Sequence, residues 1–191
     1  TAVSGSGESV AFGAGIFNYY SSPTIINCDF LKNWTYGAFD YGYGVVSGGG
    51  GIFNYHSDPN IINCTFIANS AHGTGFYEST YNGGSVGGGI CSFNSSPVII
   101  NCVFSDNSSF GAYAPHSYYG GAIYSQGGST IISGCTFSGN WVRHEHWSDW
   151  SNGGAIHIHE NTDAIIDDCV FIENIAMKPG KLNKQQLLEK T

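Results

Sequence analysis

The sequence repeats itself five times, and this repeat limits the possible folds more than any other feature. Each copy opens with a Gly-rich turn that ends in Ile, and copies begin 33 to 38 residues apart. A Cys-x-Phe-x-x-Asn motif follows each of these Ile residues by 12 or 13 positions. Coincident anchors at a fixed period indicate a repeat architecture. The anchoring Ile and Cys residues are Ile16 and Cys28, Ile52 and Cys64, Ile90 and Cys102, Ile123 and Cys135, and Ile156 and Cys169.

Each unit is short, rich in β-formers and free of helical periodicity. An Ile-Ile pair before every Cys, such as Ile25-Ile26, predicts a buried strand. Ser-Pro or Asp-Pro upstream of three of these pairs predicts a turn. One unit cannot bury its apolar face alone, but stacked units can, with equivalent strands paired at ~4.8 Å. We therefore expect an all-β parallel solenoid of about five rungs, in which Ile, Cys, Phe and Asn form ladders.

The paired motifs make the resemblance specific. Gly120–Ile123 with Phe137–Asn140, and Gly153–Ile156 with Phe171–Asn174, resemble the Gly-Gly-Ala-Ile and Phe-x-x-Asn signatures of the polymorphic outer membrane protein repeat, first described in chlamydial surface autotransporters. The first three copies carry Gly in place of the Ala. The resemblance covers roughly residues 11 to 177. It implies a right-handed parallel β-helix on a cell surface, where members act in adhesion, although such a repeat specifies fold better than function.

The charge balance excludes some partners. The chain has six Lys and Arg against 14 Asp and Glu, a net charge of −8. Only Lys32 and Arg143 are cations within residues 1–177, so we expect no nucleic-acid binding. No stretch approaches the ~20 apolar residues of a membrane helix, so we expect no membrane insertion by this segment. Low charge with abundant Gly, Ser, Asn and Tyr favours an extracellular or outer-surface location.

The connections between each Phe-x-x-Asn motif and the next Gly-rich turn are unusually aromatic. Because they leave the coil at equivalent points, we expect long loops that stack along one edge of the rod. Long surface loops on a rigid scaffold are the usual seat of binding. The candidate binding residues in these connections are Trp34, Tyr36, Tyr41, Tyr118, Tyr119, Trp141, Trp147 and Trp150.

Alternation along the strand after each Gly-rich turn predicts two outward-facing ladders. The first holds Phe17, Phe53, Cys91, Tyr124 and His157, and the second holds Tyr19, Tyr55, Phe93, Gln126 and His159. Two interpretations are open. Exposed rows of rings can stack on sugars or on another protein, which makes Tyr19, Tyr55, Phe93 and Tyr124 further binding candidates. Alternatively, the long loops fold back over the rings and form a second small core.

Five of the six Cys residues belong to one inward-facing ladder. We expect them to be buried free thiols that pack as small hydrophobic groups. Cys91 lies on the outward ladder and is the reactive candidate, unless a loop covers it.

The best candidate metal site combines the fourth connection with the strand that follows it. His144 and His146 form one His-x-His pair, and His157 and His159 form another. Imidazole suits Zn, Cu or Ni. The other interpretation is a polar loop edge that happens to be rich in His. Asp167 and Glu173 are a weak candidate for a structural divalent cation, and we expect no other cofactor.

These features favour a non-catalytic module for adhesion or structural assembly. It would bind a neutral polysaccharide, other copies of itself, or further coils of a larger parent protein. The alternative is a carbohydrate-active enzyme, either a polysaccharide lyase or a glycoside hydrolase, on the same fold. Hydrolases need two facing carboxylates, whereas the acids here are spread over different rungs.

We expect one β-helical domain over residues 1–177 and a Lys-rich cap or linker over 178–191.

Overall fold

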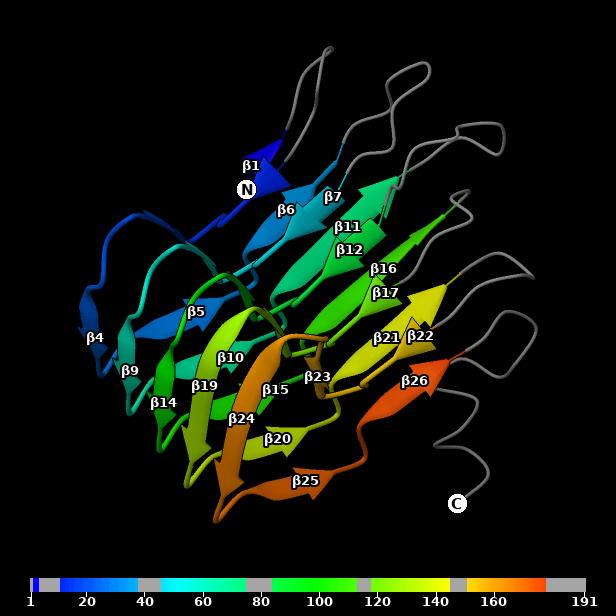
Figure 1. Ribbon diagram of the computed structural model, residues 1–191. Helices are drawn as coiled ribbons and strands as arrows, with labels where there is room; N and C mark the ends of the chain where they lie inside the picture. Colours follow the sequence, from blue (N-terminus) through cyan, green and yellow to red (C-terminus); the bar gives the residue numbers. More distant parts are fainter. Residues whose placement is uncertain are drawn as a thin grey trace.

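The computed structural model describes residues 2–3, 11–37, 46–74, 84–112, 118–144 and 151–177. Within these ranges the chain is a parallel β-solenoid of 26 short strands with no helix. Successive strands pass from one sheet to the next, and equivalent strands of consecutive repeats pair side by side (Figure 1). Every strand pairing is parallel. The predicted fold class is confirmed.

Five sheets, named A to E here, run along the solenoid. Three of them enclose its interior. Sheet C contains β3 (Ile16–Tyr19), β8 (Ile52–Tyr55), β13 (Ile90–Phe93), β18 (Ile123–Gln126) and β23 (Ile156–Ile158). Sheet D contains β4 (Thr24–Ile26), β9 (Asn60–Ile62), β14 (Val98–Ile100), β19 (Gly128–Ser133) and β24 (Thr162–Asp167). Sheet E contains β5 (Asp29–Leu31), β10 (Thr65–Ile67), β15 (Val103–Ser105), β20 (Thr136–Ser138) and β25 (Val170–Ile172).

The other two sheets lie next to each other on one side of the molecule (Figure 1). Sheet A contains β1 (Ala2–Val3), β6 (Trp34–Tyr36), β11 (Ser70–Thr74), β16 (Ser108–Ala112), β21 (Trp141–His144) and β26 (Ile175–Met177). Sheet B contains β2 (Ala11–Phe12), β7 (Val46–Gly48), β12 (Gly84–Val86), β17 (Tyr118–Tyr119) and β22 (Ser151–Asn152). The aromatic connections expected as loops therefore begin and end as paired strands. Only their middle parts lie outside the described residues.

The main core consists of the predicted ladders. Ile52, Ile90 and Ile123 line sheet C, and the Phe residues of sheet E stack face to face along the interior. The ring centroids of Phe66 and Phe104 lie 4.7 Å apart with planes inclined by 5°. That separation matches the spacing of paired strands. The backbone repeat therefore sets the ring stacking.

A ladder of Asn side chains lies at the turn between sheets E and A. The Nδ2 of Asn107 donates to Oδ1 of Asn140 at 2.9 Å and to the carbonyl oxygen of Phe66 at 2.9 Å. Its own Oδ1 accepts from the backbone N–H and Nδ2 of Asn69, both at 3.0 Å. Such buried polar groups stabilise a fold only when they are fully hydrogen-bonded. This need explains why every Phe-x-x-Asn motif ends in Asn.

The outward ladders of sheet C have the predicted register, but the exposure of their side chains differs from rung to rung. Phe53, Cys91 and Tyr124 are buried, together with Val86 of sheet B, in a second core. Phe12 of sheet B stacks on Phe53 with ring centroids 4.0 Å apart. The middle rungs are therefore covered in a second core, as the second interpretation predicts. The covering side chains, Phe12, Val86 and Tyr119, belong to strands of sheet B and not to loops.

The Cys predictions are partly corrected. All six thiols are free, and Cys64, Cys102 and Cys135 are buried as expected. Cys28 is exposed and Cys169 is half-buried, because each lies in a terminal rung with a neighbour on one side only. Cys91, the predicted reactive thiol, is fully buried, and burial raises its pKa well above the ordinary value.

Candidate functional site

Alternation along the strands of sheet A separates an inner face from an outer face. The middle residues Thr35, Ala71 and Ser109 are completely buried against sheet B. Ser109 Oγ donates to the carbonyl oxygen of Ser85 at 2.7 Å, which ties the two sheets together. Because neighbouring residues of a strand point to opposite faces, the residues on either side point outward. They form two columns that cross the strands of sheet A.

The first column is a stack of rings. Tyr36, His72, Phe110 and Arg143 occupy equivalent positions on neighbouring strands. The ring centroids of Tyr36 and His72 lie 4.7 Å apart, and those of His72 and Phe110 lie 4.5 Å apart. At the fourth rung the ring is supplied by Trp141, which stacks on Phe110 at 5.3 Å with an interplanar angle of 30°. We call Tyr36, His72, Phe110 and Trp141 the aromatic column.

The second column has a large side chain at each end and two small side chains between them. Trp34, Ser70, Ser108 and Trp141 are register partners on successive strands. Ser108 Oγ donates to Ser70 Oγ at 3.1 Å. Two small hydroxyl residues therefore separate two indoles along the strand-stacking direction. The surface is hollowed at the serines because their side chains do not reach the height of the rings.

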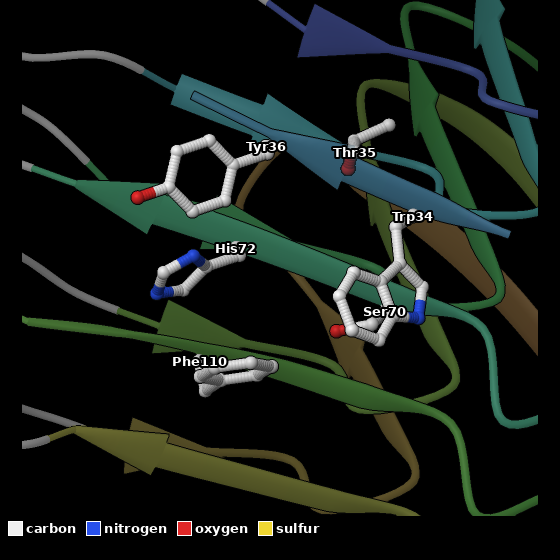
Figure 2. Close-up of a pocket in the computed structure, with 6 residues that line it drawn as sticks. All are labelled: Trp34, Thr35, Tyr36, Ser70, His72 and Phe110. Carbon is white, nitrogen blue, oxygen red and sulfur yellow. The ribbon is translucent and has the colours of Figure 1, made fainter. Parts of the chain in front are cut away.

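This hollow is a groove of about 230 Å³ (Figure 2). The Trp34 indole stands on one side, and the rings of Tyr36, His72 and Phe110 stand on the other. The indole is 58% exposed. Within the part of the chain that the structure describes, no lining side chain is a carboxylate, a lysine or an arginine. The groove is lined by Trp34, Thr35, Tyr36, Ser70, His72 and Phe110.

A second group of exposed rings lies at the turn between sheets C and D. Tyr19 is 59% exposed and stacks parallel to Tyr55 at 5.7 Å, and Tyr20 stacks on His56 at 4.9 Å. Tyr20 and His56 have φ values of 49° and 47°, a region that bulky residues rarely adopt. The equivalent residues of the next two repeats are Asn94 and Gly127, which accept this conformation more readily.

The structure brings together only some of the predicted binding residues. Trp34, Tyr36 and Trp141 share the outer face of sheet A. Tyr118 and Tyr124 are buried, and Tyr119 and Phe93 are packed against the second core, so these four do not form an open surface. The predicted residues Tyr41, Trp147 and Trp150 lie outside the described part of the chain.

The sequence analysis missed Ser70, which lines the groove, and Ser108, the hydroxyl residue that contacts Ser70 from the next strand. It also treated His72 and Phe110 as parts of loops, although they lie on strands. Aligning the repeats on one another would have identified this column from the sequence. Counting from each Asn of the ladder places Trp34, Ser70, Ser108 and Trp141 at the same position, directly after that Asn.

The candidate metal ligands are placed only in part. The rings of His157 and His159 lie 5.7 Å apart, and His157 stacks on Tyr119 at 4.2 Å. Burial, with a smaller effect of His159, lowers the pKa of His157 to about 4. His146 and the side chain of His144 are outside the described residues. No group of three or more potential ligands, Asp167 and Glu173 included, occurs in the described ranges.

The fold and this surface define a parallel β-solenoid that carries an aromatic groove on one sheet. Residues 101–126 match the model of the Chlamydia polymorphic membrane protein repeat. This stretch runs from the Phe104–Asn107 motif to the Gly120–Ile123 turn, and the solenoid fits a β-helix built from such repeats. The match suggests a surface protein similar to those outer membrane proteins. No significant match to this chain is found among curated proteins or solved structures.

None of the described segments forms a helix long and apolar enough to span a bilayer.

Proposed function

We propose that this chain is a non-catalytic recognition module of the cell surface that binds a glycan along the outer face of sheet A. The observation that carries the proposal is the row of four rings from Tyr36 to Trp141, one on each of four consecutive strands. Stiff aromatic side chains provide large contact area at low entropic cost. At about 4.8 Å per strand, the row extends over roughly 14 Å.

The location of the rings supports binding more than packing. In the two cores, rings are covered by Ile side chains or by sheet B, whereas the column is beside a groove. Hydroxyl groups of Ser70 and Ser108 lie between the rings of this face. Apolar rings combined with a few polar groups are typical of ligand sites. The same combination suits a sugar, which has C–H faces and hydroxyl edges.

Self-association is the competing proposal, and the sheet topology makes its simplest form unfavourable. Sheet A has six strands and the other sheets have five, because β1 pairs with β6 beyond the first repeat. A second copy stacked in register on the last repeat would place its own β1 where β26 already lies. End-to-end stacking would therefore require β1 to move.

A carbohydrate-active enzyme remains the alternative function. Glycoside hydrolysis requires a pair of carboxylates beside the bond to be cleaved. The described residues that line the groove include no carboxylate. The proposal therefore predicts that bound oligosaccharides are recovered intact, without reducing-end or unsaturated products.

A binding measurement with the full chain tests this function. Immobilised neutral oligosaccharides, such as cellohexaose, chitohexaose and a galactan, are probed with wild-type protein and with Phe110→Ser and Trp141→Ala variants. We expect at least one glycan to bind and both variants to weaken it at least tenfold, as for central aromatic contacts elsewhere. Tyr20→Asn is the matched control, because Tyr20 is an exposed ring on another surface. Loss of binding only in Tyr20→Asn, or binding to none of the glycans, would overturn the proposal.

A further inference from the structure

The aromatic column and Trp34 differ in what covers their rings. Each ring of the column stacks on at least one neighbour. Trp34 has Ser70 as its register partner, and its indole makes no ring contact within the described ranges. A serine side chain is too short to cover an indole. The break in the ladder therefore leaves a large aromatic surface open to a ligand beside the groove.

The groove has the size and charge of a site for a small neutral group. Its volume of about 230 Å³ is below the ~300–1,000 Å³ of pockets that hold drug-sized ligands. Among the described residues, its lining offers no carboxylate, lysine or arginine to pair with a carboxylate, a sulfate or an ammonium group. Arg143, which carries the charge nearest in register, is on β21 and does not line the groove.

The groove also presents a hydrogen-bond donor with no acceptor in the described residues. Ser70 is 7% exposed, and its Oγ already accepts from Ser108. The Ser70 hydroxyl proton is thus available to another oxygen, and Figure 2 shows this hydroxyl pointing toward the space beside Trp34. A ligand oxygen in the groove would accept this hydrogen bond in place of solvent.

We propose that this groove is a subsite for one uncharged pyranose ring of the glycan. The C–H face of the sugar lies against the Trp34 indole, and a ring hydroxyl accepts a hydrogen bond from Ser70. This inference rests on the proposed function and names the sugar class that the site selects. A sugar fits better than an apolar side chain of another protein, because it supplies both an apolar face and an acceptor oxygen.

The test uses two neutral glycosides that differ in configuration at C4, and a third that differs from the glucoside by a carboxylate at C6. Methyl β-glucopyranoside, methyl β-galactopyranoside and methyl β-glucuronide are titrated into the 191-residue chain labelled with ¹⁵N at the Trp indoles. We expect at least one neutral glycoside to shift the Trp34 indole resonance, and the glucuronide to bind at least tenfold more weakly. Arg143→Gln should leave the neutral titration unchanged. Stronger binding of the glucuronide, or loss of neutral binding in Arg143→Gln, would overturn the proposal.

Two variants act on the groove itself. Ser70→Phe fills it with a ring and should abolish the Trp34 shift, whereas Ser70→Ala removes only the donor and should weaken binding several-fold. Circular dichroism establishes that each variant is folded, and Ser70→Ala remains informative if Ser70→Phe is not. If Ser70→Phe and Ser70→Ala still bind the soluble sugar normally, the subsite is wrong. The proposed function would stand in that case if Phe110→Ser still abolishes binding to the immobilised glycans.

Discussion

Asn107 donates from its Nδ2 to Oδ1 of Asn140, 2.9 Å away on the next repeat, and this contact recurs along the solenoid. The amide groups of Asn69, Asn107 and Asn140 satisfy one another while completely removed from water. The ladder therefore links consecutive repeats in one register. Every strand that carries the groove follows directly after one of these Asn residues.

Asn107→Ala should destabilise the protein by about 3 kcal/mol, because it leaves several buried partners without a hydrogen bond. Urea unfolding monitored by circular dichroism measures the free energy of unfolding. Asn33→Ala is the control. Asn33 is half-buried in the first repeat, and among the described residues its side chain donates to Asn69 alone, so we expect a loss of about 1 kcal/mol. Equal losses in both variants would contradict the cooperative ladder.

Gly87→Ala should cost about 2–3 kcal/mol. Gly87 has a φ of 60°, and a Cβ there would collide with the carbonyl oxygen of Ile90. All five repeats have Gly with positive φ at this position. Gly89→Ala is the matched substitution two residues later, where Ala122 stands in the fourth repeat. It should cost clearly less, and the thermal midpoints of the two variants give the comparison.

Thiol labelling of the native protein should distinguish the end rungs from the middle. We expect rapid modification of Cys28, slower modification of Cys169, and protection of the other four thiols until unfolding. Burial raises the pKa of Cys64 and that of Cys91, which further suppresses the reactive thiolate. Mass spectrometry after a short pulse of iodoacetamide identifies the modified sites. Early labelling of Cys91 would mean that sheet B does not cover sheet C.

The free energy of unfolding should decrease as the pH falls from about 6.5 to about 4, because His157 is held neutral in the folded protein over this range. Its pKa is about 4 in the folded protein and 6.5 when unperturbed, because burial disfavours the charged ring. Between pH 6.5 and pH 4 the unfolded chain therefore binds a proton that the folded chain does not, and the free energy of unfolding decreases. His157→Gln should remove this part of the slope. Identical slopes for wild type and variant in urea unfolding would contradict the buried neutral ring.

The repeat made the main fold predictable because packing imposes the same residue at each rung. Ile, Phe and Asn recur at fixed offsets, and strands stacked in register bring equivalent residues together. The fourth Ile-Ile pair shows a limit of this reasoning. Ile132, and not Ile131, pairs with Ile99, since the distance to the following Cys sets the register.

The cover of the second core was not predictable from alternation alone. A period of two tells which residues point away from the interior, but not what lies over them. Phe12, Val86 and Tyr119 provide that cover, from short strands that precede the Gly-rich turns. The groove could not be predicted for a related reason. The Trp-Thr-Tyr segment is equally compatible with an aromatic loop, and only its pairing with Ser70 and His72 identifies it as a strand.

The most direct test of the central claim is a map of where a neutral glycan contacts the protein. Amide and indole chemical shifts of the full chain are recorded during titration with cellohexaose, chitohexaose or the galactan oligosaccharide that binds best. Perturbations concentrated on Trp34, Ser70, His72, Phe110 and Trp141 are the predicted result. Perturbations confined to Tyr19, Tyr20, Tyr55 and His56, or no perturbation with any of these glycans, would contradict the account.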